Sequence, residues 1–72
     1  MENKLKAAGW FFNGGCSCSP KKYKYKHTNH TDILIKIIRS YNKYEIYRHN
    51  QLIASGEVST FEAAMSSNGL TI

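Results

Sequence analysis

Acidic residues are scarce in this 72-residue chain, and they are scattered. The acids are Glu2, Asp32, Glu45, Glu57 and Glu62, against ten lysines and arginines. General acid–base catalysis needs paired groups whose environments tune their pKa values, and this spacing offers no such pair. A cysteine nucleophile would need an oriented base, and no spacing identifies one. We therefore expect a protein that is not an enzyme.

Long apolar runs are also missing. No stretch approaches the roughly 20 apolar residues that cross a bilayer, and residues 1–8 lack the apolar stretch of a signal peptide. There is no internal repeat and no low-complexity linker. A hydrophobic fraction of 42% argues against disorder. We expect a single small domain over residues 1–72, without a membrane partner, that begins its life in a reducing cytoplasm.

The positive charge of the chain lies in its first half. Residues 1–31 carry six lysines and one glutamate, which gives +5, whereas residues 32–72 carry four cations and four carboxylates, which gives zero. Such asymmetry indicates that the two halves face different surroundings. We predict that residues 32–72 form a neutral, self-sufficient sheet-and-helix unit and that residues 1–31 form a basic extension that makes contacts.

The second half has the pattern of strands followed by a helix. Three β-favoured stretches, 33–39, 44–48 and 52–58, are separated by turn-forming residues, among them Asn42, which tolerates a left-handed conformation. Gly56 inside the third stretch predicts a bulge or a close backbone approach. The sequence therefore predicts an α+β fold, in which a three-stranded antiparallel β-meander is covered by one C-terminal helix.

The helix after residue 58 has clear end signals. Ser59 and Glu62 fit a capping box, in which each side chain bonds the other's backbone. Phe61 and Met65 follow helical spacing and would face the sheet, while Gly69 is a natural residue to end the helix in a Schellman motif. Packing has to hold so short a helix, because short helices are marginal alone.

The first half begins with a possible two-turn helix over residues 2–8, ended by Gly9, and it has room for one added strand. The aromatic run Trp10, Phe11 and Phe12, if extended, places rings on both faces of the chain. We expect these rings to pack mainly on the small core; the alternative is an interface with another chain.

Cys16 and Cys18 form a Cys-x-Cys pair that His27 and His30 could complete into four zinc ligands. The usual spacing of structural zinc cysteines is longer, so the likeness is loose. Reduced structural thiols are the more favoured interpretation, and disulfides or ligation between chains are a third. The histidines alone are more often plain surface residues.

A basic and aromatic run follows, with Lys21 ahead of an alternating segment. Extended, this segment places Lys22, Lys24 and Lys26 on one face and Tyr23, Tyr25 and His27 on the other. The tyrosines would pack on protein. The lysines could touch phosphates without reading sequence, dock on an acidic protein, or merely guard an edge strand.

Residues 5–26, with Gly9-Trp10, Gly14-Gly15-Cys16-Ser17-Cys18-Ser19 and the Lys/Tyr run, resemble small proteins of crAss-like tailed phages of gut Bacteroidales. The resemblance covers about a third of the chain. It implies a phage protein and a minor structural component of the particle, located in the virion or the host cytoplasm. The order of strands and helix is also similar to the arm-binding domains of phage integrases and the N-terminal domains of ribonuclease H.

Together these features predict a non-enzymatic structural or interaction protein that docks on a larger assembly such as the virion, through other subunits or itself. The alternative is a nucleic-acid-binding module that contacts phosphates through residues 21–26. The predicted contact residues are Trp10, Phe11, Phe12, Lys21, Lys22, Lys24 and Lys26.

Overall fold

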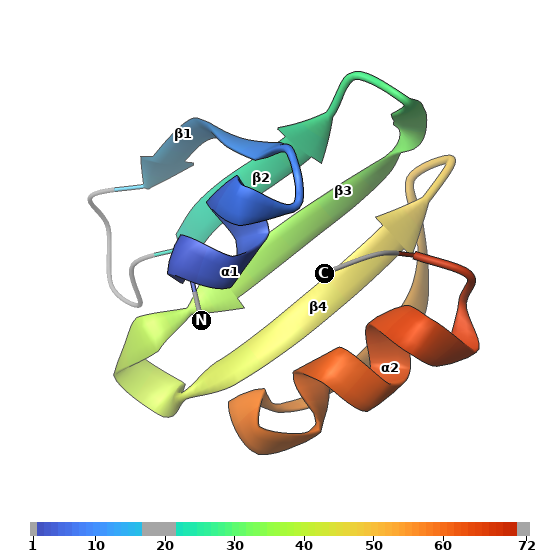
Figure 1. The fold of residues 1–72 in the computed structure, drawn as a ribbon. Helices are drawn as coiled ribbons and strands as arrows, with labels where there is room; N and C mark the ends of the chain where they lie inside the picture. The colour runs from blue at the N-terminus through green and yellow to red at the C-terminus, as the bar shows by residue number, and fades with distance from the viewer. Residues whose placement is uncertain (1, 17–21, 71–72) are drawn as a thin grey trace.

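The computed structural model of this protein describes residues 2–16 and 22–70 (Figure 1). Two short α-helices and five strands follow one another with two single turns of 3₁₀-helix between them. The elements in chain order are α1 (Glu2–Ala7), β1 (Trp10–Cys16), β2 (Lys22–His27), β3 (His30–Ile38), η1 (Arg39–Tyr41), β4 (Lys43–Arg48), β5 (Gln51–Glu57), η2 (Val58–Thr60) and α2 (Phe61–Ser67).

The strands form one sheet in the order β1-β2-β3-β4-β5, and every neighbouring pair is antiparallel. The predicted α+β class is confirmed, and so is the meander over residues 33–58. The predicted number of strands is wrong, because the sheet has five strands where the sequence predicted three and room for one more. The two additional strands, β1 and β2, come from the basic first half.

The first half joins the fold because its own apolar side chains are needed in the core. Leu5, Trp10 and Tyr25 are at most 3% exposed, and they belong to the same buried cluster as Ile35. Tyr25 lies directly opposite Ile35 in the β2–β3 ladder, so the alternation of β2 turns its tyrosines toward the core. The first half is therefore part of the domain's core and not only an extension that makes contacts.

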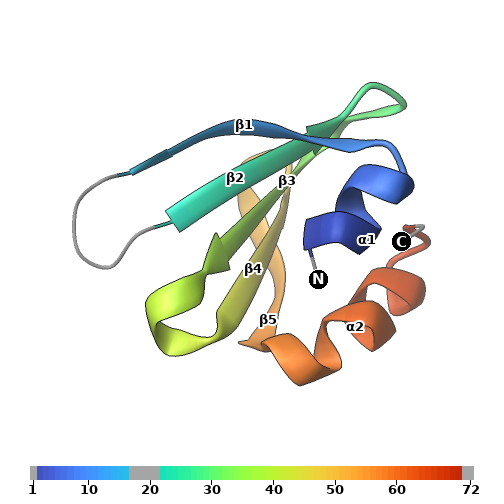
Figure 2. The same ribbon diagram turned by 60° about the vertical axis from the view of Figure 1, so that its left-hand side comes forward.

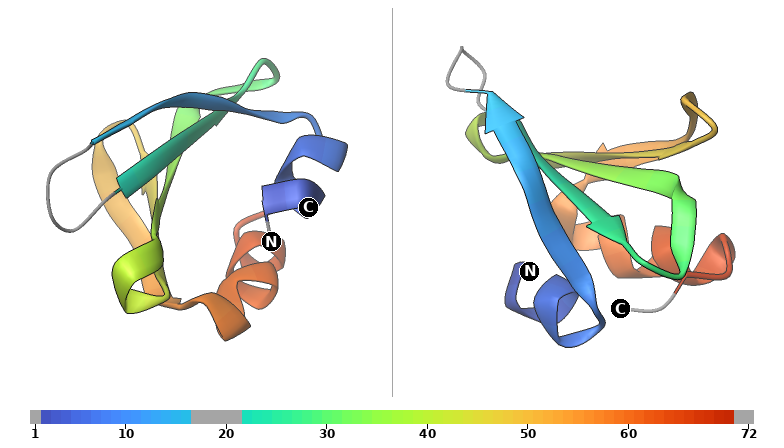
Figure 3. Two further views of the ribbon diagram at one scale, coloured as in Figure 1. Left: turned by 90° about the vertical axis from the view of Figure 1, so that its left-hand side faces the viewer. Right: turned by 90° about the horizontal axis from the view of Figure 1, so that it is seen from above.

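Both helices lie on the same side of the sheet, which we call the inner face, with α1 over β1 and β2 and α2 over β4 and β5 (Figures 1, 2 and 3). Phe61 and Met65 of α2 are fully buried against the sheet, as predicted. Lys4 of α1 forms an ion pair with Glu62 of α2. Both side chains of that pair are more than half exposed, so it adds at most about 1 kcal/mol.

The structure confirms the predicted C-terminal end of α2 but not the predicted N-terminal cap of that helix. The amide of Leu70 donates to the Met65 carbonyl at 2.9 Å and the amide of Gly69 to the Ser66 carbonyl at 3.1 Å, which is the predicted Schellman motif. The predicted capping box is wrong. The N-cap is Thr60, without a side-chain cap bond, because its hydroxyl donates instead to the Glu57 carbonyl at 2.9 Å.

Bulges and turns shape the strands around this core. Asn42 adopts the predicted left-handed conformation with φ 54°. At Gly56 the neighbours are side chains and not the predicted backbone, since a Cβ there would lie 3.3 Å from the Thr60 hydroxyl oxygen. The bulge in β5 lies not at Gly56 but at Ile53, an additional residue where the register with β4 shifts. A second shift in β1, next to Gly14, lengthens that strand relative to β2.

Candidate functional site

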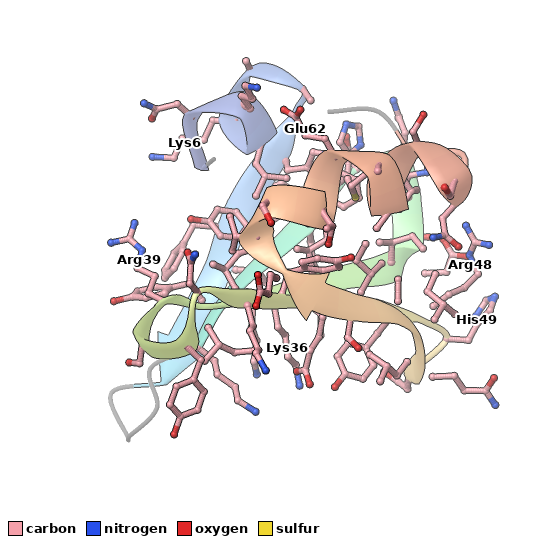
Figure 4. All side chains as sticks on the ribbon, turned by 90° about the horizontal axis from the view of Figure 1, so that it is seen from below. Lys6, Lys36, Arg39, Arg48, His49 and Glu62 are labelled. Carbon is pink, nitrogen blue, oxygen red and sulfur yellow. The ribbon has the colours of Figure 1, made fainter. Side chains whose placement is uncertain are left out.

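The lysines of β2 lie on the side of the sheet that carries no helix, which we call the outer face. Tyr25 is 3% exposed on the inner face, and alternation then directs Lys22, Lys24 and Lys26 outward. Lys24 is directly opposite Lys36 of β3, and Figure 4 shows Lys36 pointing away from the helices. The predicted separation of lysines and tyrosines on β2 is confirmed. Lys21 lies outside the described residues.

The other lysines of the outer face lie opposite carboxylates across the ladders. Lys36 is directly opposite Glu45, and Lys43 is directly opposite Glu57. Opposite charges at such positions attract. No acidic residue in the described part of β1 or β3 lies opposite a lysine of β2, so the positive charge that remains on this face is concentrated along β2.

Lys24 and Lys36 form a pair of like charges that are directly opposite one another. Such pairs destabilise a sheet. Tyr47 of β4, on the side of β3 away from β2, relieves part of this electrostatic repulsion. The ammonium of Lys36 lies 4.7 Å from the ring centroid of Tyr47, a favourable cation–π distance. Among the described residues, no aromatic ring relieves Lys24 in this way, which leaves its charge available to an external anion.

Tyr47 stands beside these charges with a hydroxyl that resists ionisation. Burial raises the pKa of Tyr47, and the charge of Glu45 raises it further. The hydroxyl donates a hydrogen bond to Glu45 Oε1 at 3.2 Å, which favours the neutral phenol. Tyr47 therefore contributes a neutral aromatic surface to the outer face.

The aromatic run of β1 is divided among three environments. Trp10 is 2% exposed in the core, whereas Phe11 and Phe12 are 45% and 51% exposed. Phe11 is directly opposite Lys26 and so shares the outer face with it. Phe12 is directly opposite Tyr25 and lies on the inner side, where its ring centroid is 6.2 Å from that of Tyr23. The expectation of core packing holds for Trp10 alone.

The two histidines named as metal ligands gather around Trp10. The ring of His30 stacks on Trp10 at 5.8 Å between centroids, and that of His27 meets it edge-on at 5.0 Å. His27 Nε2 donates to the Ala8 carbonyl at 2.9 Å, while Nδ1 accepts the Asn29 amide at 3.0 Å. Both ring nitrogens of His27 are therefore already used, which leaves neither for a metal.

The described geometry also separates the predicted zinc ligands. Cys16 pairs with Lys22, at the opposite end of β2 from His27, so their backbones are roughly 16 Å apart at the usual rise of a strand. One zinc ion with bonds of about 2.0–2.3 Å cannot be reached from both positions in one chain. Cys18 lies outside the described residues. Within the described ranges, no three histidine, cysteine or acidic residues form a metal-binding group.

A pocket of about 290 Å³ adjoins the lysine strand and was not foreseen from the sequence. It lies where β3 departs from its register with β2 between Tyr25 and His27. The lining includes Lys26, Thr31, Asp32, Leu34, His49 and Asn50. The residues come from β2, β3 and the β4–β5 turn, so local pattern could not reveal their meeting. The only local signal was the polar turn at 49–50.

In comparisons with known proteins, no family model, no curated protein and no solved structure matches this chain. In residues 2–16 and 22–70, neither helix has the length and apolar character needed to cross a membrane.

Proposed function

We propose that this protein is a non-enzymatic module that binds nucleic acid by contacting phosphates with the lysines of β2. The observation that carries the proposal is the column of Lys22, Lys24 and Lys26 on the outer face. Among the described residues no carboxylate is directly opposite them in a ladder, while Lys36 and Lys43 each have one. Contacts of this kind are electrostatic and independent of sequence, and they release counterions from the nucleic acid.

The spacing of the column supports contact with a backbone. Alternate residues of a strand are about 6.6 Å apart, which is close to the separation of successive phosphates in an extended nucleic-acid strand. The three lysines are half-buried, as expected where lysine stems lie along a surface and keep their ammonium groups in water. A linear row of cations at that repeat fits a linear polyanion better than it fits a compact small anion.

The test is a titration of fluorescent oligonucleotides at several salt concentrations. Each of Lys22→Gln, Lys24→Gln and Lys26→Gln should weaken binding and lower the slope of log affinity against log salt by about 0.7–0.9. Lys43→Gln is the matched control, because Lys43 is on the same face but opposite Glu57. Absence of binding at low salt, or an equal loss in the control, would overturn the proposal.

A second candidate function is docking on a larger protein assembly, which the resemblance to phage proteins also suggests. Leu52 and Ile53 of β5 are 52% and 37% exposed on an edge strand, and Phe12 is exposed on the other edge strand. Exposed apolar groups on unpaired edges favour pairing with another chain. We propose other virion subunits, or a second copy, as partners at these edges.

Sedimentation and co-purification from the source particle test the docking function. We expect Leu52→Lys to reduce self-association or retention of a co-purifying partner. Lys24→Gln should leave both unchanged. A compact monomer that retains no partner in the particle would exclude docking while leaving the nucleic-acid proposal intact.

A further inference from the structure

On the outer face, Lys26 has a different neighbour toward each of the two strands that flank β2. On the β1 side, Phe11 is directly opposite Lys26 and is 45% exposed. On the β3 side, Lys26 lines the 290 Å³ pocket. An aromatic ring, a cation and a pocket therefore follow one another across the sheet, at the end of the lysine column.

The pocket is polar, and its one carboxylate is already neutralised. Asp32 Oδ2 lies 3.5 Å from Arg48 Nε and 3.6 Å from His49 Nε2. The same carboxylate can accept an N–H from a ligand, and the side-chain amide of Asn50, which lines the pocket, can donate or accept. Leu34 provides apolar surface in the same wall. A flat heterocycle with N–H and carbonyl groups at its edge matches this lining.

The geometry points to a single-stranded nucleic acid as the ligand of the outer face, with one base stacked on Phe11 and a neighbouring base in the pocket beside Lys26. This inference rests on the proposed function, since the lysines supply the phosphate contacts. Aromatic stacking and a cationic track are the two components of single-strand binding sites. A duplex can use the lysines alone, because its bases are stacked and paired inside the helix.

The alternation within β2 separates its own aromatics from its lysines, and the neighbouring strand supplies the missing ring. The Phe11–Lys26 pairing places them side by side, since directly opposite Cβ atoms are about 4.5–5.5 Å apart. Phe12 has a similar exposure but lies on the inner side, opposite Tyr25. These two adjacent phenylalanines therefore provide a test residue and its control.

The first test compares single strands with the duplex of the same sequence in direct binding titrations. Phe11→Leu should weaken single-strand binding by about 5- to 150-fold, the range expected for one stacked base, and leave duplex binding unchanged. Phe12→Leu should change neither. Two results would overturn the stacking of a base on Phe11. One is an equal loss of single-strand affinity in Phe11→Leu and Phe12→Leu, and the other is an equal loss of single-strand and duplex affinity in Phe11→Leu.

The second test follows backbone amide shifts by NMR during titration with homopolymer single strands and with the duplex. We expect single strands to perturb the β2 amides and also those of residues 31–34 and 49–50, and the duplex to perturb β2 only. Asn50→Gly, which suits the positive φ of 64° at that position, should reduce single-strand affinity only. If β2 responds and the pocket does not, the inference is wrong while the proposed function stands.

Failure of the proposed function itself has a separate signature. If neither nucleic acid perturbs β2 at low salt, the lysine column does not bind phosphates. An acidic polypeptide that perturbs β2 and competes with single strands at equal charge concentration would show that the face recognises charge alone. That result would also overturn the assignment of a base to the pocket.

Discussion

At the scale of single residues, Gly9 shows how the end of α1 and the histidine cluster depend on each other. Gly9 has φ +97°, and a Cβ there would lie 2.6 Å from His27 Nε2. The same nitrogen bonds the Ala8 carbonyl. The glycine is therefore required twice, for its left-handed backbone and for the space that the imidazole occupies.

We expect Gly9→Ala to lower the free energy of unfolding more than Gly69→Ala does. Gly69 also has a positive φ, of 71°, but nothing lies within 4 Å of a Cβ there, so its substitution costs only the left-handed strain of about 1–2 kcal/mol. At Gly9 the displacement of His27 adds to that strain. Chemical denaturation of both variants measures the difference, and equal losses would contradict it.

Tyr47 makes stability depend on pH in the alkaline range. Its pKa is raised above the ordinary tyrosine value of 10.0 in the folded state, by burial first and then by Glu45. The unfolded chain therefore loses this proton at lower pH than the folded chain. The resulting stabilisation is complete below about pH 10 and is lost as the pH rises through the folded pKa.

Glu45→Gln should bring the Tyr47 pKa closer to 10.0 and make the alkaline loss of stability smaller. Ultraviolet titration of the tyrosines gives the pKa, and denaturation at a series of pH values gives the stability. Tyr25 also has a raised pKa, caused by burial and then by Tyr23, and it should titrate alike in both proteins. An unchanged titration in Glu45→Gln would show that Glu45 does not act on Tyr47.

At the scale of elements, α2 is held by packing more than by its own end signals. The capping box predicted at its start does not form, and its seven residues are too few for an independent helix. Phe61 is fully buried and meets the ring of Tyr44 edge-on at 5.1 Å between centroids. The contacts of Phe61 and Met65 with the sheet therefore fix the position of the helix.

Phe61→Ala should lower the free energy of unfolding by about 3–5 kcal/mol, as expected for a buried phenylalanine. Glu62→Ala is the neighbouring control, and it should cost at most about 1 kcal/mol because its ion pair with Lys4 is exposed. Thermal or denaturant unfolding measures both. A small loss for Phe61→Ala would mean that α2 contributes little to the core.

At the scale of the whole molecule, the two halves of the chain share one core. The neutral half forms β4, β5, α2 and residues 32–38 of β3, yet its Ile35 packs against Tyr25 of β2 in the same buried cluster as Leu5 and Trp10. Removal of residues 1–31 would expose the edge of β3 and one side of this cluster. The separation of charge along the sequence is therefore not a separation of folding units.

We expect the isolated fragment 32–72 to lack a cooperative unfolding transition, while the intact chain shows one. A chain of that size buries too little surface to fold alone without additional support. Circular dichroism during heating distinguishes the two outcomes. A fragment that melts cooperatively would restore the self-sufficient unit that the charge pattern indicated.

The sequence by itself determined most features that depend on near neighbours, with the capping box at the start of α2 as the exception. The alternation of β2, the meander over 33–58, the left-handed Asn42 and the helix ends at Gly9 and Gly69 all follow from local sterics and hydrogen bonding. These features need only residues a few positions apart, so they are present in the sequence pattern.

Only the tertiary structure decided which strands joined the sheet and what meets on its outer face. Register between strands depends on the side chains that the whole core buries, and a shift of one residue reverses the faces. The pairing of Phe11 with Lys26, the distance of Cys16 from His27 and the pocket between β2, β3 and the β4–β5 turn all depend on that choice. The reason is that burial is a property of the assembled core and not of any one segment.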